Sequence, residues 1–182
     1  MQHTTISYSD TGRFSTLMSD YLAKHKDLKP FYGRFPNVAN FEKQAKEKLQ
    51  LYPSSSRKKL VEVLKKQYEN IENAPKAHHS ITLLSEENSV TIITGHQLCL
   101  MTGPLYFIYK IITTIKVGYK LSKKYPEFNF IPVYWMASED HDLKEIQSFL
   151  FRGKKIQWNS EQEGSAVGTI QLDDLVPVLD HF

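Results

Sequence analysis

The chain lacks several features that would quickly assign a protein to a class. Its 182 residues include a single cysteine, Cys99, which excludes a disulfide within the chain and fits a reducing compartment. The formal net charge is only +3, so no strongly basic surface indicates a nucleic-acid partner. The longest apolar segment, residues 105–117, is interrupted by Lys110 and Lys116 and is too short to span a bilayer. The first seven residues lack the basic and apolar regions of a signal peptide, so we expect a cytoplasmic protein without membrane partners.

The first half of the chain, residues 1–88, has the pattern of a mainly helical region that packs on a core. Apolar residues recur at helical spacing in segments 15–24, 41–51 and 57–70, and a further short helix is expected near residues 81–84. Three serines at 54–56 offer N-cap oxygens for the helix that follows them. Lysines, Arg57 and interspersed glutamates between residues 42 and 66 are typical of solvated helix faces. This region shows no chemistry of its own.

The second half, residues 89–182, begins with a strand–helix–strand pattern. Residues 90–94 are rich in β-branched side chains and predict a buried strand, and residues 129–136 predict a second one. Between them, Pro104 suits the first turn of a helix that should end near residues 123–126. This order predicts a right-handed parallel unit in an α/β fold, although Pro132 is unusual for a central strand.

The remainder of the chain has weaker signals. Segments 145–151 and 155–158 flank Arg152-Gly153-Lys154 and predict a β-hairpin after the second core strand. Residues 164–172 are expected to form another strand. The last segment, 175–182, is apolar and carries no capping signal, so we expect this chain to be part of a longer unit.

The loop from Thr94 to Pro104 is the first candidate site. A glycine-bearing turn between a strand and a helix presents backbone N–H groups to an anion, and His96 and Gln97 add side-chain donors. The loop contains neither Gly-x-Gly-x-x-Gly nor Gly-Lys-Ser/Thr, the stronger nucleotide patterns. A plain strand-to-helix connection with Gly95 and Gly103 at its corners explains the same residues.

Cys99, between two leucines, is explained best as a packed, unreactive thiol.

The second candidate site is the peptide from Ser138 to Asp142, which follows the second strand. Its carboxylates and His141 suit acid–base chemistry or a cation, although adjacent side chains rarely converge on one metal and we assign no metal site. The alternative is a helix N-terminus capped by Ser138. Because the carboxyl ends of parallel strands meet at one edge of a sheet, we predict that both candidate peptides open into a common crevice.

Two segments resemble a known family. The first is Ile93–Gln97 followed by Thr102–Tyr106 and Tyr109–Lys110, and the second is Pro132–Asp142 with its run Trp-x-Ala-Ser-Glu-Asp-His-Asp. In order and spacing they are similar to the bacillithiol biosynthesis cysteine-adding enzymes, the BshC family. The family turn usually reads Gly-Gln-Gln, so His96 stands where a glutamine is usual. The resemblance covers residues 90–146 well and only about the first third of the longer family members.

The resemblance implies a Rossmann-like core and a carbon–nitrogen ligase that joins L-cysteine to the amine of glucosaminyl-malate. Because this reaction forms an amide, a carboxylate must be activated, and ATP or another nucleotide with Mg²⁺ is the expected cofactor. The resemblance also implies a homodimer formed through a coiled coil outside this chain. The chain alone is expected to be inactive, and a non-catalytic anion- or nucleotide-binding module is the alternative. The predicted catalytic residues are Glu139, Asp140, His141 and Asp142. The predicted substrate- or nucleotide-binding residues are Thr94, Gly95, His96, Gln97, Gly103, Lys110, Trp135 and Ser138.

Overall fold

A computed structural model describes residues 4–180 of the chain. The chain forms two compact units, residues 1–47 and 48–182, and each is considered by itself. Residues 1–3 of the segment tested for a signal peptide, and residues 181–182 of the apolar end, lie outside the described part. The predicted division at residues 88/89 follows the change from helical sequence to strand and remains a prediction.

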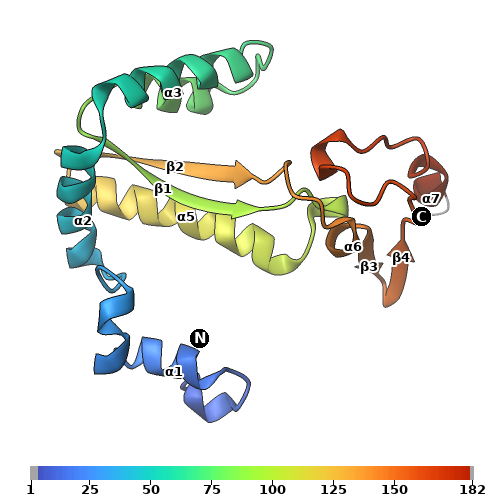
Figure 1. Ribbon diagram of the computed structural model, residues 1–182, viewed down its shortest axis with the longest axis horizontal. Coiled ribbons are helices and arrows are strands. Elements are labelled where there is room, and N and C mark those ends of the chain that lie inside the picture. The colour runs from blue at the N-terminus through green and yellow to red at the C-terminus, as the bar shows by residue number, and fades with distance from the viewer. Residues whose placement is uncertain (1–3, 181–182) are drawn as a thin grey trace. The chain divides into compact units, whose positions relative to one another are not determined.

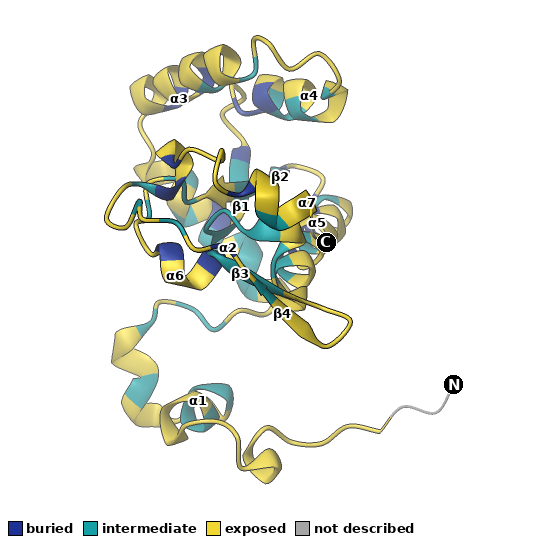
Figure 2. Ribbon diagram, turned by 90° about the vertical axis from the view of Figure 1, so that its right-hand side faces the viewer, coloured by how far each residue is buried: buried dark blue, intermediate teal, exposed yellow. Residues whose placement is uncertain are grey.

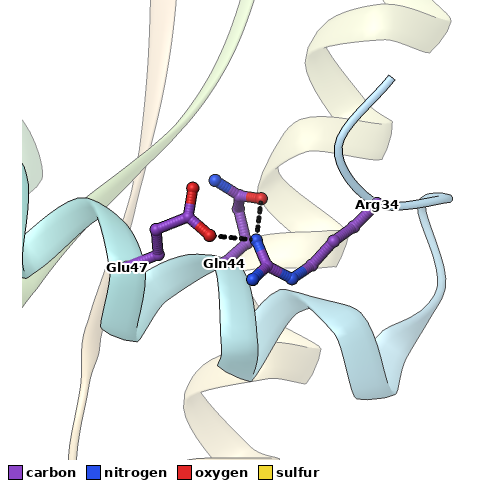
Figure 3. A network of polar contacts seen from close by, with 3 residues as sticks. All are labelled: Arg34, Gln44 and Glu47. Atoms are coloured by element: carbon purple, nitrogen blue, oxygen red, sulfur yellow. Dashed lines mark hydrogen bonds and ion pairs between the residues drawn. The ribbon is translucent and has the colours of Figure 1, made fainter. Parts of the chain in front are cut away.

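The first unit is helical and carries little core. It contains η1 (Ser9–Thr11), α1 (Thr16–Leu22), η2 (Lys26–Phe31) and most of α2 (Val38–Leu51). The predicted helix near residue 15 is confirmed, with the Ser15 hydroxyl accepting from the Met18 N–H at 3.3 Å. Arg34 donates to Gln44 at 2.9 Å and pairs with Glu47, so the loop before α2 is fastened to that helix (Figure 3). Among its described residues only Ala45 is buried. Figure 2 shows α1 in the colours of exposed and intermediate residues.

The second unit is built on two parallel strands. β1 (Ser89–His96) pairs with β2 (Asn129–Met136) from Ser89 opposite Asn129 to His96 opposite Met136. The helix α5 (Leu105–Lys124) joins them, which confirms the predicted parallel unit (Figure 1). Pro132 causes no conflict because the described sheet has two strands and each has a free edge. Pro104 is the N-cap of α5 with an extended backbone, one residue before its predicted place inside the first turn.

Helices cover both faces of this sheet. α5 packs along both strands through its buried face, which includes Thr114, Gly118 and Leu121. α3 (Ser54–Gln67) and α4 (Pro75–Leu83) pack on the other face, where Val61, Ile81 and Leu84 meet Ile131 of β2 (Figure 1). The predicted serine cap of α3 is wrong. Ser54–Ser56 form the first turn of the helix itself, and Pro53 precedes it without a side-chain cap.

The segment after β2 folds around a second core. α6 (Leu143–Ile146) leads into the antiparallel hairpin of β3 (Ser148–Phe151) and β4 (Lys154–Gln157), as predicted. The chain then passes through η4 (Val167–Thr169) to α7 (Val176–Asp180). We name as the C-terminal cluster its buried apolar residues: Leu143, Ile146, Trp158, Val167, Ile170 and Leu175.

The strand predicted for residues 164–172 is wrong. The segment forms a 3₁₀ turn, and Gly164 has a φ of +85°, which lies outside the range of a regular strand. The backbone N–H groups of Val167 and Gly168 donate to the peptide after β2 instead of to a strand. Val167 and Ile170 are both buried, a three-residue spacing that does not alternate as strand residues do.

No helix within residues 4–180 is both long and apolar enough to cross a membrane.

Candidate functional site at the carboxyl end of the parallel strands

The two candidate peptides lie together at one end of the sheet. The β1–β2 register puts His96 beside Met136, so the loops that follow the strands start side by side. The Ala137 N–H donates to the His96 carbonyl at 3.1 Å, and the Tyr134 hydroxyl donates to the same oxygen at 2.9 Å. Further along, the Gln97 amide donates to the Glu145 carboxylate of α6. Both peptides therefore lie at the same end of the sheet, and their opening into a common crevice remains a prediction.

The glycines of the first peptide are explained by packing within the chain. Gly103 has a φ of +64°, and a Cβ there would lie 2.8 Å from the Cβ of Cys99. A Cβ on Gly95 would lie 3.1 Å from the Trp135 carbonyl oxygen of the neighbouring strand. Met101 and Thr102 also have positive φ, so the turn into α5 holds two successive non-glycine residues in an unfavourable region just before Gly103. Such strain persists only where the surroundings fix it, which here include the packing of Cys99.

The predicted anion donors of the first peptide have partners inside the protein. The Lys110 ammonium donates to the Gly95 carbonyl. The two ring nitrogens of His96 lie 2.8 Å from the Tyr106 hydroxyl and 3.1 Å from the Gln97 carbonyl. Thr94 lies within β1 opposite Tyr134. These contacts hold the loop in shape, and the proposed roles of these residues toward a ligand remain predictions.

Cys99 lies near a histidine but is not activated. Its Sγ is 3.4 Å from Nδ1 of His96, and the flanking Leu98 and Leu100 pack on the C-terminal cluster. Burial, and to a lesser degree the negative charge of Glu145, raise the pKa of the Cys99 thiol. Burial also raises the pKa of Tyr134, followed by the effect of Cys99, which keeps its hydroxyl a donor. A thiol that stays protonated is a poor nucleophile.

The acidic residues of the second peptide make local hydrogen bonds. Glu139 accepts from the Trp135 indole at 3.2 Å. Asp140 accepts from the N–H of Asp142 at 2.9 Å, and Asp142 accepts from the N–H of Glu145 at 3.2 Å. Asp142 is therefore the N-cap of α6, a position that the sequence alternative gave to Ser138. Among the described residues, no hydrogen bond or ion pair engages the exposed imidazole of His141.

A contact that the sequence did not indicate holds the second peptide in place. The N–H groups of Val167 and Gly168 donate to the carbonyls of Asp140 and Ser138 at 2.7 and 2.9 Å. A Cβ on Gly168 would lie 2.7 Å from the Cβ of Ser138, so only glycine fits there without displacement. Gly168 carried no sequence signal because its segment read as a strand.

The carboxylates of the second peptide are separated by their local hydrogen bonds. Within residues 4–180, no three histidine, cysteine or acidic side chains converge as a metal site.

Comparison with known proteins decides the family. Residues 1–182 match the family described as "Bacillithiol biosynthesis BshC, N-terminal Rossmann-like domain". The chain belongs to this family. The match also confirms the Rossmann-like fold that the sequence resemblance implied.

Relatives of several lineages carry one name, "Putative cysteine ligase BshC". The chain is 51% identical over 177 residues to the protein of Flavobacterium johnsoniae, which covers 97% of this chain and 33% of the relative. It is 46% identical to that of Christiangramia forsetii, with 97% and 34% covered. It is 30% identical to that of Desulforamulus reducens, again with 97% and 34% covered. The chain thus spans about a third of the length of these relatives.

Proposed function

We propose that this chain forms the N-terminal Rossmann-like part of a cytoplasmic cysteine ligase that joins L-cysteine to the amine of glucosaminyl-malate in bacillithiol biosynthesis. The family match and the names of its relatives support this assignment. The observation on which it rests most is the β1–β2 register, which brings the Gly95–Gly103 loop and the Ser138–Asp142 peptide to the carboxyl end of the sheet. Open α/β sheets bind their ligands at that end.

The proposed reaction requires two events at the joining atoms. The amine nitrogen of glucosaminyl-malate forms a bond to the carboxyl carbon of cysteine, and one activated carboxylate oxygen leaves. The nitrogen must also lose a proton. The side chain that accepts this proton must be accessible to the substrate. Histidine suits the role because its ordinary pKa lies close to neutral pH.

His141 fits the role of proton acceptor better than its neighbours. Its imidazole is exposed and uncommitted among the described residues, whereas Glu139, Asp140 and Asp142 accept hydrogen bonds that shape the peptide. We therefore assign proton transfer to His141. Asp140 and Asp142 position it by fixing the turn before α6, and Trp135 and Ser138 line the same end of β2.

Activation of a carboxylate needs an energy-rich group, and we propose ATP with Mg²⁺ as its source. In the part of the chain that the structure describes, no three histidine, cysteine or acidic side chains converge on one point, so we assign no residues to Mg²⁺. The Lys110 ammonium donates to the Gly95 carbonyl, and the Gly103 N–H donates to the Leu100 carbonyl. We therefore assign to this chain no step that passes through the metal or the nucleotide.

The experiment uses a full-length chimera, because the chain spans a third of its relatives. This chain replaces the matched segment of the Flavobacterium johnsoniae relative, and the chimera is assayed with L-cysteine, glucosaminyl-malate and ATP–Mg²⁺. The double variant Asp140→Asn/His141→Asn should lose at least about 100-fold in turnover, the usual worth of a positioned acid–base group. Folding should persist because the amide oxygen of the asparagine introduced at position 140 still accepts from the Asp142 N–H.

The matched control is Lys144→Gln, an exposed change two residues after the peptide, which should leave turnover unaltered. Equal turnover by the double variant and the unaltered chimera would reject the role of His141. Absence of product from the unaltered chimera, under conditions where the Flavobacterium johnsoniae protein forms it, would reject the proposed function itself.

A further inference from the structure

The helix α5 is apolar on two faces, and only one of them is used. The first face packs on the sheet through Thr114, Gly118 and Leu121. The second, which we name the outer stripe, consists of Leu105, Ile108, Ile112, Ile115 and Tyr119. These five side chains have exposed fractions between 38% and 67%. A helix that is apolar on two faces is ordinarily enclosed on both.

The outer stripe is continuous along the helix. Its members are spaced alternately three and four residues apart, the spacing by which one helix packs against another. At about 100° per residue the stripe is centred roughly 140° around the helix from the buried face. Scattered apolar residues on a surface are common, but a continuous apolar row of this length marks an interaction surface.

The charges beside the outer stripe indicate the kind of partner. α5 carries five lysines, namely Lys110, Lys116, Lys120, Lys123 and Lys124, and no acidic residue. Lys116 and Lys123, seven residues apart, flank the stripe on one side. A second copy of the same helix would bring lysines against lysines, which disfavours self-association. A partner helix with acidic side chains beside its apolar row complements both properties.

We propose that the outer stripe docks an acidic amphipathic helix supplied by the two thirds of the family polypeptide that lie outside the matched region. The relatives are about three times as long as this chain. The described sheet has two strands, and helices of this chain cover both of its faces, so the surface left uncovered is the outer stripe of α5. A helix from the rest of the polypeptide would cover this exposed apolar row. This inference is independent of the proposed reaction.

Thiol labelling tests the covering of the stripe directly. Ile112→Cys and Ile115→Cys lie on the stripe, and Thr113→Cys, exposed between them on a different face, is the matched control. Labelling rates by iodoacetamide are measured peptide by peptide in the 182-residue chain and in the full-length chimera. We expect rapid labelling of all three in the short chain. In the chimera, labelling at 112 and 115 should be at least about tenfold slower, because it requires local opening, and labelling at 113 should be unchanged.

Two results would overturn the proposal. Equal labelling of positions 112 and 115 in both proteins would show that nothing from the rest of the polypeptide covers the stripe. Slow, concentration-dependent labelling in the short chain would show that a second copy covers it instead. The acidic character is tested separately by Lys116→Glu/Lys123→Glu in the chimera, which should restore labelling at Ile112→Cys at least in part. Lys120→Glu, farther around the helix, should not, and equal effects of the two changes would reject the charge argument.

Discussion

The two ends of the parallel strands differ in how exposed their side chains are. At the amino end, Arg57 and Ser89 are only 8% and 3% exposed, and the Arg57 guanidinium donates to the carbonyls of Leu84 and Ser89 at 2.9 and 3.1 Å. The Asn129 amide also donates to Asn88 and Ser89. At the carboxyl end, Trp135 and Met136 are 60% and 54% exposed. The exposed His141 lies just beyond them.

This difference indicates that the amino end of the sheet contributes mainly to stability and the carboxyl end mainly to binding and chemistry. Buried polar groups contribute to stability only when each has its partner, and the amino end satisfies that condition through Arg57. The carboxyl end leaves side chains accessible, as a binding site requires. Substitutions at the amino end should therefore act on folding, and substitutions at the carboxyl end should act on turnover unless they disturb the packing that holds Ser138 and Asp140.

The largest effect on stability is expected from Arg57→Met. The change removes two charge-assisted hydrogen bonds and leaves the Leu84 and Ser89 carbonyls buried without that donor, at a cost of about 3 kcal/mol. Urea denaturation of the 182-residue chain measures it. Lys58→Met, the exposed neighbour on α3, is the control and should change stability little. A loss below about 1 kcal/mol for Arg57→Met would remove the basis for calling the amino end the stabilising one.

A smaller loss of stability is expected from a substitution at the carboxyl end that disturbs the packing around Ser138. In Gly168→Ala the new methyl group meets the Cβ of Ser138, and such overpacking costs about 2 kcal/mol. Adding Ser138→Gly removes the side-chain atom that is met and should recover part of the loss, which a double-mutant cycle from urea denaturation measures. Gly33→Ala, with open space around it, is the control. A simple sum of the two single effects would show that Gly168 does not act on Ser138.

The regular part of this second unit could be predicted from sequence because periodicity and β-branching act locally. The bounds of β2 and the parallel pairing agree with the prediction. The prediction that Arg57 lies on a solvated helix face with the neighbouring lysines is wrong, because its side chain is buried. Its burial depends on carbonyls 27 and 32 residues away, and no local pattern encodes such a partner.

The candidate site could be predicted only in part, because several of its contacts join residues that are far apart in the sequence. The place of both peptides follows from the rule that parallel strands end at the same edge, so their meeting could be predicted. The partners of Lys110 and His96 could not, because a basic side chain near a glycine turn suits a carbonyl as well as an anion. The contact of Gly168 with Ser138 joins segments 30 positions apart and emerged only in three dimensions.

The smallest expected effect is a change in the reactivity of Cys99, a packed thiol at the otherwise exposed carboxyl end. Burial is the larger cause of its raised pKa and Glu145 the smaller one. Because a raised pKa lowers the thiolate fraction at a given pH, alkylation at pH 8 should be slow in the folded chain. It should be modestly faster in Glu145→Gln, which removes a negative charge yet keeps an acceptor for Gln97, and fastest in the urea-unfolded chain. Iodoacetamide rates followed by mass spectrometry give this order, with Glu163→Gln as the charge-matched control.

A folded chain that reacts as fast as the unfolded one would contradict the protonated, packed state of Cys99. The thiol beside His96 would then become a candidate nucleophile at the same end of the sheet as His141.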